Sequence, residues 1–132
     1  MKISLLLVTS RAADVAELTE ILSESQWGLT CVSRLKDAET EIKAAAAPIV
    51  LLDRDITACW QDTMKRLITL RRRACVILIS NVSDQYLWDE VIQHGGFDCL
   101  ARPFRKEQAL STLVFALAHS RTSWPTTAVE QH

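Results

Sequence analysis

The sequence predicts an α/β protein, a three-layer, doubly wound parallel sheet of five strands with helices on both faces. Two observations predict this class. Short apolar runs recur along the chain and are nearly continuous, as expected for strands that are buried on both faces. Helix-length stretches separate these runs, and such alternation indicates a parallel sheet with right-handed crossovers. The length of 132 residues is that of one domain.

Five segments are expected to form the strands. Three of them are almost purely apolar, residues 3–8, 49–52 and 76–79. Residues 29–35 are less uniformly apolar, and we expect an edge strand there. Residues 97–101 are expected to form the fifth strand.

Five helices are expected between and after these strands, over residues 10–24, 37–47, 60–73, 83–94 and 105–120. Ser10 and Ser83 are suited to begin the first and fourth helices, because a hydroxyl side chain can accept a hydrogen bond from a free N–H of the first turn. A pair of glycines ends the fourth helix. We therefore expect the domain to span residues 1–121, with residues 122–132 as a tail or linker stub.

The composition excludes several classes of protein. The formal net charge is -1, from 15 Lys and Arg against 16 Asp and Glu, so no overall field favours nucleic acid or an anionic membrane. Clean apolar runs such as residues 5–8 are far too short to span a bilayer, and the N-terminus has no signal-peptide pattern. We expect a cytoplasmic protein that binds neither nucleic acid nor a membrane.

The spacing of cysteine and histidine predicts neither a disulfide framework nor a zinc site. The four cysteines lie far apart with no C-x-x-C pair, which is typical of a chain that stays reduced. The three histidines have no partner at the spacing of metal ligands.

The carboxyl ends of the strands are where sheets of this class bind their ligands. Those ends carry Thr9, Ser10, Asp53, Ser80 and Arg102. Asp53 closes a buried strand, so we expect its carboxylate to emerge at this edge. A carboxylate there can accept a phosphoryl group, bind a metal, form half of an ion pair, or accept hydrogen bonds from loop amides.

Three segments at this edge resemble the receiver domain of two-component response regulators. They are residues 49–53 (IVLLD), 76–81 (VILISN) and 94–104 (HGGFDCLARPF). The third is similar, in register and without a gap, to the family's A-G-A-D-D-Y-L-x-K-P-F stretch. The resemblance extends over roughly residues 1–121 and implies the flavodoxin-like strand order 2-1-3-4-5. It also implies a signalling module of a phosphorelay rather than an enzyme.

Receivers use an acidic pair after the first strand to hold Mg²⁺, and an Asp after the third strand to accept the phosphoryl group. A Ser or Thr after the fourth strand and a Lys after the fifth bind the phosphoryl oxygens. Carried over to this sequence, the phosphoacceptor position is Asp53 and the hydroxyl is Ser80. Thr9 and Ser10 replace the acidic pair, and Arg102 replaces the Lys.

These replacements predict a degenerate site. Thr9 and Ser10 are neutral and cannot supply the carboxylates that Mg²⁺ prefers, so we expect weak or absent Mg²⁺ binding and no cofactor. Arg102 is expected to grip Asp53 in a bidentate pair. The aromatic switch position of the fifth strand is Cys99. The favoured hypothesis is a module that works without normal aspartyl phosphorylation; a working receiver phosphorylated on Asp53 remains the alternative.

The resemblance also implies a surface for partners. In receivers the face made by the fourth helix, the fifth strand and the fifth helix commonly dimerises or docks another protein. Here that region holds Trp88, Asp89, Arg102, Phe104 and Lys106, a mixture of aromatic and charged side chains as interfaces have. The expected partner is a histidine kinase or an output protein, and a homodimer is an alternative.

A rival motif belongs to an enzyme family. Residues 53–57 (DRDIT) match the D-x-D-x-T signature of haloacid-dehalogenase-like phosphatases, in which the first Asp is the nucleophile and the second a general acid/base. Residues 76–81 resemble that family's second motif. The signature follows the third strand here rather than the first, and the later acidic motif is absent. A phosphatase is therefore the remote alternative.

Overall fold

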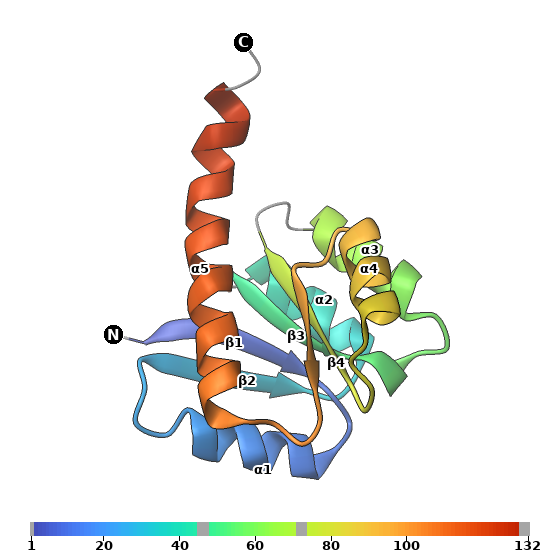
Figure 1. Ribbon diagram of the computed structural model, residues 1–132, viewed down its shortest axis with the longest axis vertical. Helices are drawn as coiled ribbons and strands as arrows, with labels where there is room; N and C mark the ends of the chain where they lie inside the picture. The colour runs from blue at the N-terminus through green and yellow to red at the C-terminus, as the bar shows by residue number, and fades with distance from the viewer. Residues whose placement is uncertain (1, 45–47, 71–73, 130–132) are drawn as a thin grey trace.

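The sheet and its helical layers have the predicted arrangement. The computed structural model describes residues 2–44, 48–70 and 74–129. Five parallel strands form one sheet in the order β2-β1-β3-β4-β5, with helices on both of its faces (Figure 1). Both the fold class and the strand order predicted from the sequence are confirmed.

The strands end together at one edge of the sheet. They are β1 (Ile3–Val8), β2 (Trp27–Val32), β3 (Ile49–Asp53), β4 (Cys75–Ser80) and β5 (Asp98–Ala101). In the parallel register Val8 pairs with Leu52, and Asp53 pairs with Ile79. The residues that follow β1, β3, β4 and β5 are therefore brought to a common rim, which is where the candidate site lies.

The helices form two layers, one on each side of the sheet. They are α1 (Ala12–Ile21), α2 (Leu35–Ala44), the short 3-10 helix η1 (Arg54–Ile56), α3 (Trp60–Leu70), α4 (Gln85–Gln93) and α5 (Lys106–Val129). Leu5 and Leu7 of β1 lie in the core shared with α1 and α5, whereas Leu6 and Val8 lie in the core shared with α2, α3 and α4. Each such leucine contributes about 1.5–3 kcal/mol through burial. This two-sided burial explains why the strand is continuously apolar.

Several predicted boundaries are wrong. The edge strand β2 is Trp27–Val32 rather than residues 29–35, because Leu35 already begins α2. Its edge position is confirmed. The end of α5 lies at Val129 rather than near residue 120. The chain has no glycine after Gly96, so the usual left-handed residue that ends a helix is missing there. Residues 122–129 of the expected tail thus continue α5.

Two predicted helix caps are also wrong. Ser10 does not cap α1: the N-cap residue is Arg11, which makes no side-chain cap bond, and the backbone N–H of Arg11 donates to the Thr9 hydroxyl instead. Ser83 does not cap α4, because the Asp84 carboxylate accepts the bond from the Leu87 N–H at 2.9 Å.

The glycine pair does end α4 as predicted. Gly95 has a φ of 92°, a left-handed conformation that glycine adopts without strain. The predicted helix ends at residues 45–47 and 71–73 lie outside the described residues. Among the helices of the described chain, none is long and apolar enough to cross a membrane.

Candidate functional site

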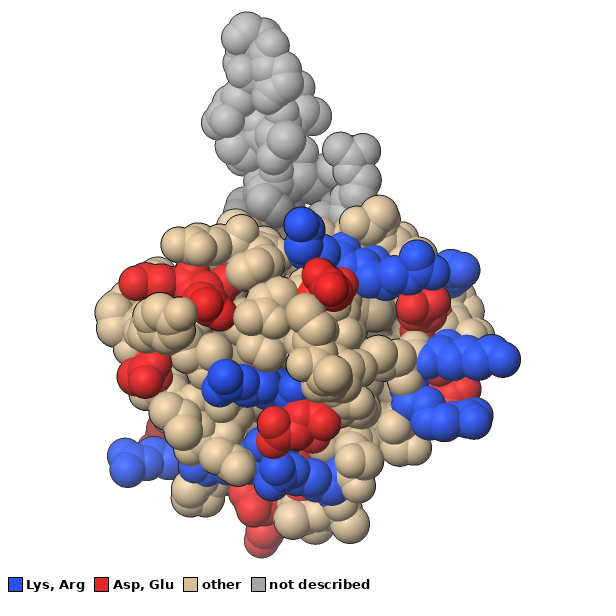
Figure 2. All heavy atoms as spheres, turned by 90° about the vertical axis from the view of Figure 1, so that its right-hand side faces the viewer, with Lys and Arg blue, Asp and Glu red and all other residues tan. Residues whose placement is uncertain are grey.

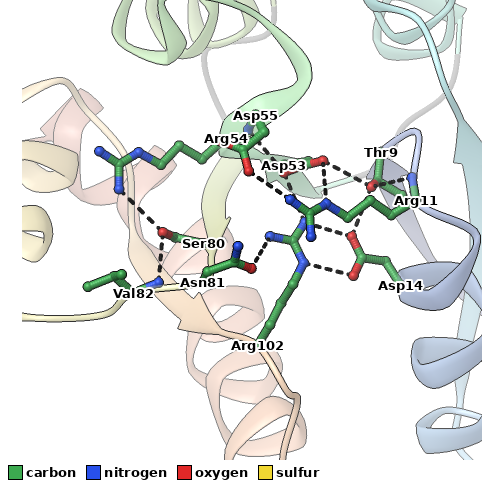
Figure 3. A network of polar contacts seen from close by, with 10 residues as sticks. All are labelled: Thr9, Arg11, Asp14, Asp53, Arg54, Asp55, Ser80, Asn81, Val82 and Arg102. Carbon is green, nitrogen blue, oxygen red and sulfur yellow. Dashed lines mark hydrogen bonds and ion pairs between the residues drawn. The ribbon is translucent and has the colours of Figure 1, made fainter.

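Asp53 lies at the centre of a polar network at the rim of the sheet (Figure 3). It is the last residue of β3 and is 1% exposed. Its Oδ1 accepts a hydrogen bond from the Asp55 N–H at 3.0 Å and lies 2.9 Å from Nη2 of Arg102. Its Oδ2 accepts from the Thr9 hydroxyl at 3.2 Å and lies 3.9 Å from Nε of Arg11. Both carboxylate oxygens are therefore already engaged.

Arg102 reaches this network from the end of β5, but its bidentate pair is not with Asp53. Its Nε and Nη2 donate to the two carboxylate oxygens of Asp14 at 2.9 and 2.7 Å. Nη2 also contacts Asp53, and Nη1 donates to the Asn81 side-chain carbonyl at 3.1 Å. The predicted bidentate grip on Asp53 is wrong, because Asp14 presents both of its oxygens to one edge of the guanidinium while Asp53 presents a single oxygen.

Asp14 is the site residue that sequence reasoning missed. It lies in the first turn of α1, is 2% exposed, and also accepts a hydrogen bond from the Thr9 hydroxyl at 2.9 Å. Burial acts to raise its pKa, but the hydrogen bonds from Arg102 and Thr9 and the charges of Arg102 and Arg11 outweigh burial and lower the pKa of Asp14. The sequence did carry a signal for this residue. Asp14 lies four residues before the inward-facing Leu18 and so is on the same face of the helix, and a charged side chain on a buried helix face requires a partner of opposite charge.

The charge balance of the network keeps Arg102 protonated. The hydrogen bond with Asp14 raises the pKa of Arg102 the most. The hydrogen bond with Asp53 and the negative charge of Asp53 raise this pKa further, although burial acts to lower it. The Arg102 side chain is only 11% exposed. A second cation, Arg11, is more exposed and pairs with Asp55 at 2.8 Å. The site is thus a compact set of buried carboxylates neutralised by guanidinium groups.

Of the two residues at the acidic-pair positions, one takes part in the network. Thr9 is 3% exposed, and its single hydroxyl proton is shared between Asp14 and Asp53. Ser10 is exposed and, in the part of the chain that the structure describes, takes no part in the network. Thr9 therefore links the two carboxylates, whereas Ser10 faces solvent.

Ser80 lies at the same rim, at the end of β4, and is 2% exposed. Its hydroxyl accepts a hydrogen bond from the Val82 N–H at 3.1 Å and a longer one from Nη1 of Arg54 at 3.4 Å. Its carbonyl accepts from the Arg102 N–H at 2.9 Å, which ties the ends of β4 and β5 together. The sequence did not single out Arg54, whose side chain lies beside Ser80 in Figure 3.

Cys99, the residue predicted to stand at the aromatic switch position, does not take part in the polar network drawn in Figure 3. It is 5% exposed and packs in the core beneath α3 and α4. Burial raises the pKa of the Cys99 thiol, and a hydrogen bond with Ser83 only partly offsets this.

The predicted interface residues separate into exposed and packed side chains. Trp88 is 39% exposed, and Asp89 and Lys106 are also exposed. Phe104 is half-buried and packs against the core beneath α1 and α5, and Arg102 points into the polar network. Sequence reasoning did not place Ile92 and Phe115 on this surface, although they are 40% and 65% exposed.

The residues of the network do not fit a magnesium ion. Mg²⁺ requires near-octahedral oxygen ligands at short distance and usually takes carboxylates together with water. Here the oxygens of Asp14 and Asp53 are bound by Arg102, by Thr9 and by a backbone N–H. Nowhere in residues 2–44, 48–70 and 74–129 do three or more His, Cys, Asp or Glu side chains gather as a metal centre.

Comparisons with known proteins identify the fold. No protein-family model and no curated protein matches the chain. The signal receiver domain of an HD domain-containing protein from Pseudomonas fluorescens Pf-5 matches with a TM-score of 0.82 at 19% identity, over 92% of this chain and 91% of that one. A CheY-like response regulator receiver domain protein from Methanospirillum hungatei JF-1 matches with a TM-score of 0.80 at 12% identity, over 93% and 99%.

A third solved structure is the beryllofluoride-activated NtrC4 receiver domain dimer, with a TM-score of 0.80 at 22% identity over 89% of this chain and 98% of that one. All three are receiver domains. The chain therefore has the receiver-domain fold of two-component response regulators, as the sequence motifs predicted.

Proposed function

We propose that this domain is a receiver-like signalling module that works through contacts with other proteins and without Mg²⁺-dependent phosphorylation of Asp53. The observation that carries the proposal is the closed polar network. The residue at the phosphoacceptor position is 1% exposed, and its two oxygens already bind Arg102, Thr9 and the Asp55 N–H.

Phosphoryl transfer to Asp53 would require breaking this network. One carboxylate oxygen must be free to attack the donor, and the negative charge of the donor must be offset by cations. The nearest cation, Arg102, is already neutralised by its bidentate pair with Asp14. Arg11 is similarly paired with Asp55. Both cations that contact Asp53 are thus already paired with other carboxylates, and the remaining one, Arg54, lies beside Ser80 rather than at the Asp53 oxygens, so little positive charge is available to a phosphoryl donor at Asp53.

The partner surface is proposed to lie on α4, β5 and α5. Glu90 accepts a hydrogen bond from Gln61 of α3, so that side of α4 faces α3. Trp88 and Ile92, one turn apart, lie on the opposite side of α4, toward β5. Figure 1 shows β5 between α4 and α5.

Phe115 of α5 extends this surface. It precedes His119 by one turn, and the ring of His119 lies 5.2 Å from the ring of Phe97, the residue directly before β5. Exposed aromatic side chains with charges around them are typical of protein interfaces.

Figure 2 shows acidic and basic side chains interspersed on the side of the molecule that carries α3 and α4, without one dominant sign. A protein partner suits such a surface better than nucleic acid does.

Two kinds of partner suit the proposed surface: another signalling protein, as a kinase or an output protein would be, and a second copy of the chain. The structurally similar NtrC4 receiver domain is a dimer.

The test is phosphoryl labelling. The protein is incubated with acetyl phosphate and MgCl₂, and the intact mass is measured before and after treatment with hydroxylamine. We expect no phosphoryl adduct on the wild type. An adduct that Asp53→Asn abolishes would establish a working phosphoacceptor and overturn the proposal. Incubation with p-nitrophenyl phosphate tests the phosphatase alternative, and we expect no hydrolysis.

A further inference from the structure

We propose that Asp14 and Asp53 together form one buried cation site, and that the guanidinium of Arg102 is its permanent occupant. The inference rests on the proposed function in one respect, namely that the site operates without a bound metal. It goes further by assigning the role of the metal to a side chain, and by bringing Asp14 into a site that is otherwise made by residues at strand ends.

The geometry is that of a bridging cation. Nη2 of Arg102 lies 2.7 Å from Oδ2 of Asp14 and 2.9 Å from Oδ1 of Asp53, so a single nitrogen joins the two carboxylates. The Thr9 hydroxyl lies 2.9 Å and 3.2 Å from the same two side chains and completes a ring of polar contacts. Figure 3 shows the guanidinium between the two acids.

The electrostatics require a cation at this position. Asp14 and Asp53 are 2% and 1% exposed, and two carboxylates buried side by side repel each other and lose their hydration. A positive charge between them cancels the repulsion and offsets part of the lost hydration. In keeping with an ionised, neutralised pair, the pKa of Asp14 lies below its usual value, with Arg102 as the main cause of the lowering.

The occupant of this site cannot dissociate, because it is a side chain of the protein, carried by the residue that directly follows β5. A bound metal leaves when its concentration falls, whereas Arg102 is joined to the site covalently. It also ties the start of α1 to the end of β5, 88 residues apart in the chain. The charge balance of the pocket is therefore independent of Mg²⁺, and the rim is held in one state. A module of this kind presents a constant surface to its partners.

The experiment removes the occupant and offers a replacement. Arg102→Met keeps an unbranched apolar stem but leaves the two carboxylates without their cation. We expect the unfolding midpoint of this variant to fall in metal-free buffer, and to rise by about 5 °C or more when millimolar MgCl₂ or MnCl₂ is added. The wild type should shift by less than about 1 °C, because its site is filled. KCl at equal ionic strength separates binding from screening.

Two further variants serve as controls. Asp14→Asn combined with Arg102→Met removes one carboxylate along with the cation, and we expect it to be more stable than Arg102→Met in metal-free buffer and to lose the response to Mg²⁺. Arg66→Met removes an arginine from the exposed pair with Glu39, and should give no response to Mg²⁺. If Arg102→Met is unfolded without metal, circular dichroism during a Mg²⁺ titration should show it refold.

Each result decides the inference. No Mg²⁺ response in Arg102→Met, whether the variant starts folded or unfolded, would overturn it. An equal response in the wild type would also overturn it, because the site would then accept a metal with Arg102 present. Labelling of wild-type Asp53 by acetyl phosphate would defeat the proposed function without changing the metal response of Arg102→Met, so the two failures are distinguishable.

Discussion

Asp14 and Arg102 are separated by 88 residues in the chain, yet Nε and Nη2 of Arg102 lie 2.9 and 2.7 Å from the two carboxylate oxygens of Asp14. Both side chains are largely buried, at 3% and 11% exposure. A buried pair of this kind is costly to break from one side, because the remaining charge keeps its desolvation penalty and loses its partner. This relationship determines how the domain responds to substitution, to pH and to attempts at restoring phosphorylation.

Asp14→Ala is expected to lower the free energy of unfolding by about 3 kcal/mol, because Arg102 then remains buried with Asp53 as its only carboxylate. Urea unfolding followed by circular dichroism measures the change. Asp37→Ala, which breaks the exposed pair with Arg34, is the matched control and should cost about 1 kcal/mol or less. A double-mutant cycle with Arg102→Met should show strong coupling. Additive losses at the two positions would contradict the assignment.

The same pair predicts the behaviour in acid. The pKa of Asp14 is lowered from the ordinary value of 3.8, so the folded state binds the proton of this carboxyl more weakly than the unfolded state does. Its contribution is therefore fully present above about pH 4 and is lost as the pH falls through the folded-state pKa. We expect the stability difference between the wild type and Asp14→Asn to shrink as the pH is lowered from 7 to about 3. A difference that stays constant would show that Asp14 is not ionised in the fold.

The cysteines provide an independent check of the core. Burial raises the pKa of Cys75 to about 11, and burial also raises the pKa of Cys99. Cys31 and Cys59 are exposed, although partial burial also raises the pKa of Cys31, so Cys59 is expected to react faster than Cys31. In the native protein at pH 8, we expect a thiol reagent such as iodoacetamide to modify Cys31 and Cys59 and to spare the other two. Peptide mapping by mass spectrometry identifies the modified residues, and rapid labelling of Cys75 would contradict the packing of β4 against α5.

Much of the fold was predictable because two-sided burial leaves a direct mark on sequence. The apolar run before Asp53 indicated a buried strand, and the parallel sheet placed the ends of β3, β4 and β5 at one rim. The edge strand β2 was misplaced because only Trp27 among its residues is buried, so its pattern is weak. Edge strands pack on fewer sides and constrain their sequences less.

The candidate site was only partly predictable. Asp53 and Arg102 follow from the topology, since both stand where strands end. Arg102 forms its bidentate pair with the carboxylate that presents two oxygens to one edge of the guanidinium. That geometry is set by how the elements pack and not by spacing along the chain. Asp14 was overlooked because it lies in a helix. Because residues 9 and 10 replace the acidic pair, the sequence indicated a site that had lost two carboxylates. The structure shows a smaller loss of negative charge, because Asp14 also belongs to the site.

Rebuilding a phosphoacceptor site consequently requires one more change than the resemblance alone implies. Thr9→Asp, Ser10→Asp and Arg102→Lys together restore the family's residue types, but Asp14 remains close by to compete for the new lysine. We expect Mg²⁺ to bind the triple variant, and labelling of Asp53 by acetyl phosphate to increase further when Asp14→Ala is added. Intact-mass measurement on the wild type, the triple variant and the quadruple variant tests this order. Equal labelling of the triple and quadruple variants would contradict a competing role for Asp14.

The partner surface predicts weak self-association through the exposed side chains of α4 and α5. Trp88→Ala together with Phe115→Ser should abolish any concentration-dependent increase in the sedimentation coefficient, because large aromatic side chains dominate the energetics of small interfaces. The matched control is Val114→Ser. Val114 is 57% exposed on α5 and is next to Phe115 in sequence, but consecutive helix residues project about 100° apart, so it lies on a different side of the helix and association should be unchanged. A wild type that stays monomeric at high concentration would exclude the homodimer and leave docking of another protein. Loss of association in Val114→Ser alone would place the interface on the opposite side of α5.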